Sequence, residues 1–154
     1  MVYVVIRVRG TVNIKPSIKR TLELMNLTRV NHCVLIDENP SAKGMLQTAK
    51  DYVTWGEVTN ESLLKLLQAR GRLAGDKPLT DSYVKSATSF KTISDIAKAI
   101  IEQKCIYRDL PEIKPVFRLS PPVKGYEGIK RSYVNKGALG YRGQHINMLL
   151  ERML

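Results

Sequence analysis

The chain has 154 residues and a formal net charge of +11, from 25 lysine and arginine side chains against 14 aspartate and glutamate side chains. Apolar residues make up 44% of the sequence, which is enough to build a core and excludes wholesale disorder. No apolar run approaches the ~18 residues of a membrane-spanning helix, and two cysteines are too few for a disulfide framework. We therefore expect a soluble, cytoplasmic, basic protein, and its charge favours a polyanionic partner such as a phosphate backbone over a merely solvated surface.

The first 57 residues alternate between strand and helix patterns. The strand patterns have a period of two, which is typical of a half-buried sheet, and each helix pattern carries one apolar stripe. The expected elements are a strand at 2–9, a helix opening at 13–16 and ending before 26, a strand at 33–37, a helix from 39–40 to 49 and a strand at 52–57.

The order of these elements predicts an α+β core, residues 1–57, with the sequence β-α-β-α-β. Because the connections are short and a three-stranded sheet is small, both helices should cover one face, as in ferredoxin-like folds. The other face, which would carry Arg7 and Arg9, is left for solvent, an extension of the chain or RNA.

Two further segments follow the core. Residues 58–110 read as a helical extension, with helix starts at Thr59 and at the capping sequence Thr92–Asp95. Residues 111–154 form a basic tail of net charge +5 that holds four of the seven prolines and five of the ten glycines, followed by a short helix at about 144–153. We expect order in this tail to depend on a partner, so that a chain without residues 111–154 keeps a folded core. The alternative is a flexible linker, which the apolar terminal helix argues against.

No pattern for catalysis, cofactor binding or metal binding stands out. His32 and Cys33 are neighbours on a predicted strand, so their side chains point to opposite faces and do not share an ion. The sequence has neither a Walker motif nor a dinucleotide fingerprint. We therefore expect no enzyme activity, cofactor, metal, small-molecule substrate or membrane association.

Motifs along nearly the whole chain resemble the archaeal form of the universal large-subunit ribosomal protein L thirty family, which is homologous to eukaryotic L seven. The motifs are Gly-Thr-Val-Asn at 10–13, Lys-Pro-Ser-Ile-Lys at 15–19, Arg-Val-Asn-His-Cys at 29–33, Asn-Pro-Ser-Ala-Lys-Gly-Met at 39–45, Asp-Tyr-Val-Thr-Trp-Gly-Glu at 51–57, Gly-Ala-Leu-Gly-Tyr-Arg-Gly at 137–143, Ile-Asn at 146–147 and Arg-Met at 152–153. The resemblance implies an antiparallel sheet, no catalysis, a place in the large ribosomal subunit, and contact with large-subunit rRNA and neighbouring ribosomal proteins. The alternative is a ferredoxin-like regulatory or ligand-binding domain of a metabolic enzyme.

The candidate rRNA contacts combine basic side chains, aromatic rings that can stack on bases, and one helix glycine. They are Arg7, Arg9, Lys15, Lys19, Arg20, Lys43, Gly44, Lys50, Trp55, Lys124, Tyr126, Lys130, Arg131, Tyr133, Lys136, Tyr141 and Arg142. Gly44 is included because glycine within a helix costs roughly 1 kcal/mol relative to alanine, which predicts a close approach of RNA or another backbone there.

Overall fold

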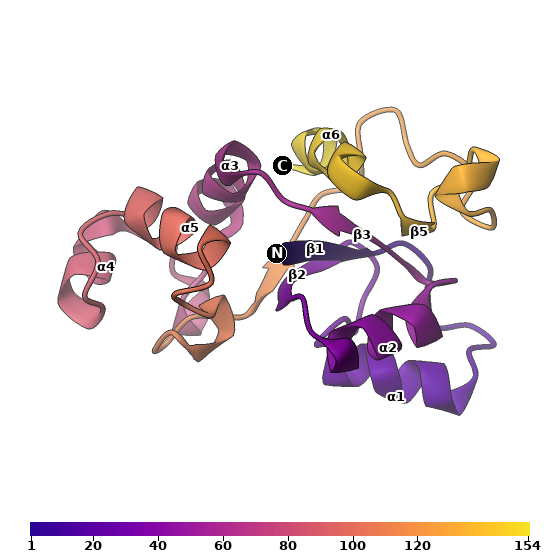
Figure 1. The fold of residues 1–154 in the computed structure, drawn as a ribbon, viewed down its shortest axis with the longest axis horizontal. Coiled ribbons are helices and arrows are strands. Elements are labelled where there is room, and N and C mark those ends of the chain that lie inside the picture. The colour runs from indigo at the N-terminus through magenta and orange to yellow at the C-terminus, as the bar shows by residue number, and fades with distance from the viewer.

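The computed structural model describes residues 1–154 and has one mixed sheet with helices on both of its faces (Figure 1). The strands are β1 (Val2–Arg7), β2 (His32–Asp37), β3 (Val53–Glu57), β4 (Val116–Arg118) and β5 (Gly140–Tyr141). The α-helices are α1 (Pro16–Leu24), α2 (Pro40–Ala49), α3 (Asn60–Arg70), α4 (Asp81–Ala87), α5 (Ile93–Ile101) and α6 (Ile146–Met153). Four short 3-10 helices are η1 (Ala74–Asp76), η2 (Tyr107–Asp109), η3 (Tyr133–Asn135) and η4 (Gly143–His145).

The predicted α+β class and the β-α-β-α-β core are confirmed, but the sheet has five strands rather than three. Its order is β4-β2-β1-β3-β5, with antiparallel pairs except between β3 and β5, which run parallel. Both added strands come from the tail. They are only three and two residues long, too short to show a period of two in the sequence.

Both predicted helices of the core cover the same face of the sheet, below it in Figure 1. Leu22 of α1 and Leu46 of α2 pack against Val5 of β1 in a nine-residue cluster. Asn39 caps α2 as expected, since its side-chain oxygen accepts a hydrogen bond from the backbone N–H of Ala42 at 2.6 Å.

The opposite face of the sheet is covered by the chain itself. Val2, Val4 and Ile6 of β1 belong to a 23-residue cluster that also takes in side chains of α3, α5 and α6. All six residues of β1 are buried, so the prediction of a half-buried strand was wrong. The face that α1 and α2 leave free is therefore covered by an extension of the chain. It is not the face of Arg7, as predicted, because Arg7 shares the face of Tyr3 and Val5, which α1 and α2 cover.

The terminal helix is the part of the tail that joins the core most completely. Ile146, Leu149, Leu150 and Met153 of α6 are all buried in the 23-residue cluster. The expectation that order in the tail depends on a partner therefore does not describe this helix, which has its own apolar partners within the chain.

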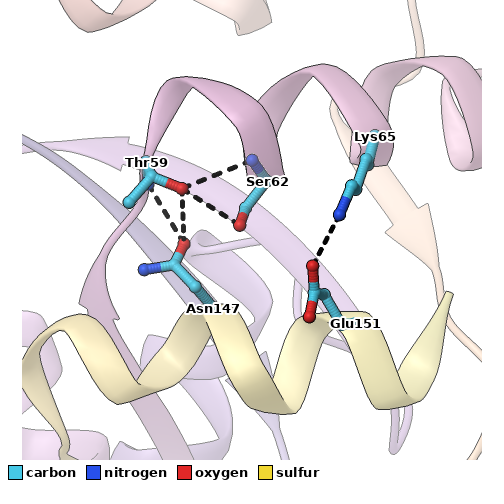
Figure 2. Close-up of polar contacts among 5 residues, drawn as sticks. All are labelled: Thr59, Ser62, Lys65, Asn147 and Glu151. Atoms are coloured by element: carbon cyan, nitrogen blue, oxygen red, sulfur yellow. Dashed lines mark hydrogen bonds and ion pairs between the residues drawn. The ribbon is translucent and has the colours of Figure 1, made fainter.

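Polar contacts also join α6 to the start of α3 (Figure 2). The side-chain oxygen of Asn147 accepts hydrogen bonds from the backbone N–H of Thr59 at 3.0 Å and from its hydroxyl at 3.4 Å. The amide nitrogen of Asn147 donates to the backbone oxygens of Glu57 at 3.1 Å and Gln144 at 2.8 Å. Asn147 thus ties the end of β3, the start of α3 and the start of α6 together.

Gly56 is required where β3 meets the turn before α6. A Cβ atom at this position would lie 1.9 Å from the backbone oxygen of Gly143 and 3.1 Å from the Cβ of Ile146. Any larger residue would push η4 and α6 away from the sheet.

Candidate nucleic-acid interface

The outward side of α1 and α2 presents basic side chains, because the apolar stripe of each helix is turned to the sheet. On α1 and its N-cap, Lys15, Lys19 and Arg20 are exposed, while Ile14 and Ile18 pack against the nine-residue cluster. The positions predicted for this helix therefore lie on its solvent side. They can reach a partner without any rearrangement of the fold.

On α2, the exposed positions are Lys43, Gly44 and Lys50. Lys43 pairs with Glu38 at 2.7 Å, and the hydrogen bond between them raises the pKa of the lysine. With Lys15, Lys19 and Arg20, these residues form what we call the α1–α2 surface. Its ion pairs are Lys43–Glu38 and Arg20–Glu23, the latter at 3.9 Å, so the charges of Lys15, Lys19 and Lys50 are unpaired.

Gly44 has open space where a side chain would begin. Nothing lies within 4 Å of the position of a Cβ atom there, so no other part of the chain accounts for the glycine. Of the two approaches predicted from the sequence, that of another backbone in the chain is not found. The approach of RNA stays a prediction.

Trp55 and Tyr141 come together at the edge where β5 joins the sheet. They are register partners on β3 and β5, and their ring centroids are 6.4 Å apart. Trp55 is partly buried, whereas Tyr141 is 50% exposed. The Tyr141 hydroxyl donates a hydrogen bond to Glu57, which raises the pKa of the tyrosine to about 12, and its ring remains accessible.

Arg7 is not at the surface, which corrects its assignment as an RNA contact. It is 2% exposed, and its Nη1 and Nε atoms donate to the backbone oxygens of Leu27 at 2.7 Å and Arg9 at 2.9 Å. Burial lowers the pKa of its guanidinium group. Arg9 is partly exposed instead, with its guanidinium carbon 5.0 Å from the centre of the Tyr52 ring.

Arg142 is likewise buried and works inside the tail. Its Nε donates to the hydroxyl of Thr54 and its Nη2 to the backbone oxygen of Ala138, each at 2.8 Å. Its guanidinium carbon also lies 4.9 Å from the centre of the Tyr133 ring. Tyr126, partly buried, donates a hydrogen bond to Asn31 at 2.6 Å. Arg142, Tyr133 and Tyr126, which were predicted as RNA contacts, therefore hold the tail against the rest of the fold.

The remaining basic candidates of the tail lie on its exposed loop. Lys124, Lys130, Arg131 and Lys136 are all exposed, and Lys124 and Lys136 adopt left-handed backbone conformations. We call these four residues the tail-loop surface. They are distinct from Arg142 and Tyr126, whose bonds set the course of the loop.

The sequence patterns did not point to a second gathering of basic side chains along the outer edge of β4. Arg29, Arg70, Arg72, Lys114 and Arg118 line adjoining hollows there, together with His32. They come from segments as far apart as residues 29 and 118, so no local run of charge indicates them. The only sequence signal for this cluster is the modest positive net charge of each segment, and that charge does not indicate which side chains lie close together.

The folded chain shows neither a metal cluster nor a membrane span. No group of three or more histidine, cysteine, aspartate or glutamate side chains is placed to hold a metal ion. None of the helices combines the length and apolar character needed to span a bilayer.

Comparison with known proteins identifies the family. The chain is 50% identical over 151 residues to the large ribosomal subunit protein uL30 of Archaeoglobus fulgidus, covering 98% of this chain and 99% of that protein. The chain belongs to the uL30 family. Proteins of the same name from Methanosphaera stadtmanae, 49% identical over 152 residues with 99% of each chain covered, and Methanocorpusculum labreanum, 49% over 151 residues with 98% and 99% covered, are also similar. The family model described as ribosomal protein L30p/L7e matches residues 3–53.

The comparisons confirm the resemblance inferred from the motifs, including its archaeal form. The matched segment of the family model covers β1 to the start of β3, which includes the whole α1–α2 surface. The archaeal uL30 relatives extend the match through α3–α5 and the tail, because they align over almost all of the chain.

Proposed function

We propose that this chain is a structural component of the large ribosomal subunit, where it binds and stabilises folded rRNA. It is part of ribosomes in the cytoplasm, and it has no catalytic role. The observation that carries the proposal is the α1–α2 surface, where unpaired lysines stand on the outer side of two helices in a chain that belongs to the uL30 family.

The α1–α2 surface would bind phosphates. Lys15 and Lys19 are four residues apart and so lie one helical turn from each other, and both side chains carry free charge. Each neutralised phosphate releases counterions, which makes such binding strongly dependent on salt. Gly44 lets the sugar–phosphate backbone come close to α2, since no side chain intervenes.

The edge of the sheet and the tail would complete the RNA contact. The ring of Tyr141, half exposed beside Trp55, is placed to stack on an unpaired base. The tail-loop surface adds four exposed positive charges. Arg7 and Arg142 support these surfaces from inside the fold and do not touch RNA themselves.

Neighbouring large-subunit proteins are the other expected partners. The runner-up, a regulatory or ligand-binding domain of a metabolic enzyme, is not favoured, because the relatives that match the full length of the chain are large ribosomal subunit proteins. A domain that binds a small metabolite would also have no need for unpaired lysines on its outer helices.

A salt series tests the proposal. The dissociation constant for large-subunit rRNA is measured at several salt concentrations for the parent chain and for the triple variant Lys15→Glu/Lys19→Glu/Arg20→Glu. We expect weaker binding by the variant and a salt slope shallower by roughly 0.7–0.9 for each phosphate that the variant no longer neutralises.

The matched control reverses three exposed lysines of α4, α5 and the loop between them, Lys85, Lys91 and Lys98, which changes the net charge equally. These helices lie away from α1 and α2 (Figure 1). Equal weakening of both variants would show that only net charge matters, and an unchanged slope in the first variant would refute RNA binding by the α1–α2 surface.

Gly44→Leu tests the close approach separately. The substitution fills open space and favours the helix, so the free protein should melt at the same temperature or higher. Incorporation into large subunits, followed by co-sedimentation after a moderate salt wash, should nevertheless fall. Normal incorporation would mean that RNA does not pass close to α2 at this residue.

A further inference from the structure

The outer edge of β4 carries a groove of positive charge that lies apart from the α1–α2 surface and the tail-loop surface. Three adjoining hollows of about 330, 310 and 410 Å³ run along this edge, and Arg118 lines all three of them. Asn26 and Thr28, just past the end of α1, line the middle hollow, so the groove begins where α1 stops. We call this feature the β4 groove.

The walls of the groove are fixed by backbone pairing. His32 and Arg118 are register partners on β2 and β4, so their side chains stand next to each other on one face of the sheet. The backbone N–H of Lys114 donates to the oxygen of Arg72 at 2.9 Å, which places these two basic residues side by side. These basic side chains therefore lie next to one another along the groove because backbone pairing fixes the positions of their strands and loops.

The balance of charge in the groove is strongly positive. Five arginine and lysine side chains line it, and Asp76 is the one carboxylate among them. Asp76 binds Lys114 at 2.5 Å and lies 3.7 Å from Arg118. The Arg118 side chain is nevertheless 68% exposed, and Arg29 is exposed with no ion pair.

Arg70 faces the groove with part of its guanidinium group already in use. Its Nη2 atom donates to the hydroxyl of Ser120 at 2.6 Å and to the backbone oxygen of Leu154 at 2.8 Å. These bonds leave its other N–H groups free, and they hold the planar group in one orientation. Planar guanidinium groups held in this way suit the oxygens of a phosphate.

The positive charges of the groove affect the protonation of His32. Burial and the charges of Arg118, Arg29 and Arg7 lower the pKa of its imidazole. Thr28 lies 3.5 Å from its Nδ1 atom, which leaves Nε2 without a partner. A bound anion would reverse the effect of the arginines and favour the protonated ring.

From this geometry we propose that the β4 groove binds the phosphate backbone of RNA, as a site additional to the α1–α2 surface. The site rests on the proposed ribosomal function and extends it, because the RNA contact then continues past the end of α1 and around the edge of the sheet. Arg29, Arg72 and Arg118 would contact phosphates directly, with Arg70 and His32 behind them. On binding, Lys114 or Arg118 would exchange its ion pair with Asp76 for an ion pair with an RNA phosphate.

The test uses the double variant Arg29→Ala/Arg118→Ala in the full chain. Both side chains are exposed, and neither makes a close bond within the fold, so the variant should melt at the parent temperature. Its binding to large-subunit rRNA should weaken, with a salt slope shallower by about 1.4–1.8 because two phosphates are no longer neutralised. The control is Lys85→Ala/Lys98→Ala, which removes the same charge from α4 and α5 and should leave the slope unchanged.

The pKa of His32 gives a second, independent readout. Followed by NMR, it should rise when a large-subunit rRNA fragment that binds the chain is added, and it should rise less in the Arg29→Ala/Arg118→Ala variant. A normal salt slope for that variant, or no rise in the pKa, would overturn the site.

The outcomes also separate this site from the proposed function. If the β4 groove variant binds rRNA normally while the α1–α2 variant does not, the groove is not an RNA site and the proposed function stands. If the groove variant alone has a shallower slope, the groove is confirmed and the α1–α2 surface is not. If the groove variant enters subunits poorly yet binds free rRNA normally, the groove contacts an acidic protein segment, which overturns the proposal.

Discussion

Removing α6 should unfold the free protein rather than trim a flexible end. Four side chains of this helix, Ile146, Leu149, Leu150 and Met153, are buried in the main core. Burying a side chain of this size contributes about 1.5–3 kcal/mol, so the helix contributes roughly 6–12 kcal/mol. A typical domain has a total stability of about 5–15 kcal/mol, and loss of the helix would remove most of it.

A point variant tests the contribution of α6 to stability in a chain that still folds. Leu150→Ala should lower the free energy of unfolding by about 2–5 kcal/mol, or the melting temperature by roughly 4–20 °C. Met148→Ala is the control on the same helix, since Met148 is 65% exposed and its loss should cost less than about 0.5 kcal/mol. Thermal and urea unfolding are followed by circular dichroism.

If the chain without residues 146–154 melts cooperatively near the temperature of the full chain, α6 adds nothing to the core. Residues 1–145 would then suffice for folding, and for this helix the sequence-based expectation of a partner-dependent tail would be correct.

Three further predictions concern single residues. Asn147→Ala should cost about 0.5–1.5 kcal/mol because it removes hydrogen bonds to the backbone of Glu57 and Thr59, the first of them partly buried. Lys65→Ala breaks only an exposed ion pair and should cost less, and urea unfolding of both variants checks the order. Gly56→Ala should destabilise the fold by about 1–3 kcal/mol through a backbone clash, while Gly44→Ala should stabilise it by about 0.5–1 kcal/mol; a destabilised Gly44→Ala would contradict the open space seen there. The pKa of His32 is lowered in the folded state, so the unfolded chain binds the proton more tightly and stability should fall as the pH drops through about 6.5; His32→Gln should remove this part of the pH dependence of the urea midpoint.

The sequence predicted the elements whose signals are local. The cap at Asn39 and the capping box at Thr92 mark real helix starts, because each depends on residues three positions apart. The apolar stripe of α1 correctly assigned Lys15 to the solvent side. The helical face of the candidate site was therefore predictable.

The features that were missed depend on contacts between distant residues. The alternation of β1 suggested a solvated face that carries Arg7, but α1 and α2 cover that face. Arg7 is buried there and donates to the backbone oxygen of Leu27. The β4 groove was missed for the same reason, since Arg29 and Arg118 meet only through the pairing of β2 and β4. Tyr126 was assigned to RNA because its residue type suits stacking, yet Asn31 holds its hydroxyl.

The contact between α6 and the start of α3 has a consequence for how the protein is made. Thr59 and Asn147 are 88 positions apart, and synthesis at about 5–20 residues per second separates them by roughly 4–18 s. During that interval the nascent chain carries a sheet whose second face is incompletely covered, with Val4 and Ile6 dependent on a helix not yet made. Substitutions that weaken α6 would therefore act first on the yield of folded protein, through aggregation or degradation of the nascent chain, before any effect on ribosome assembly.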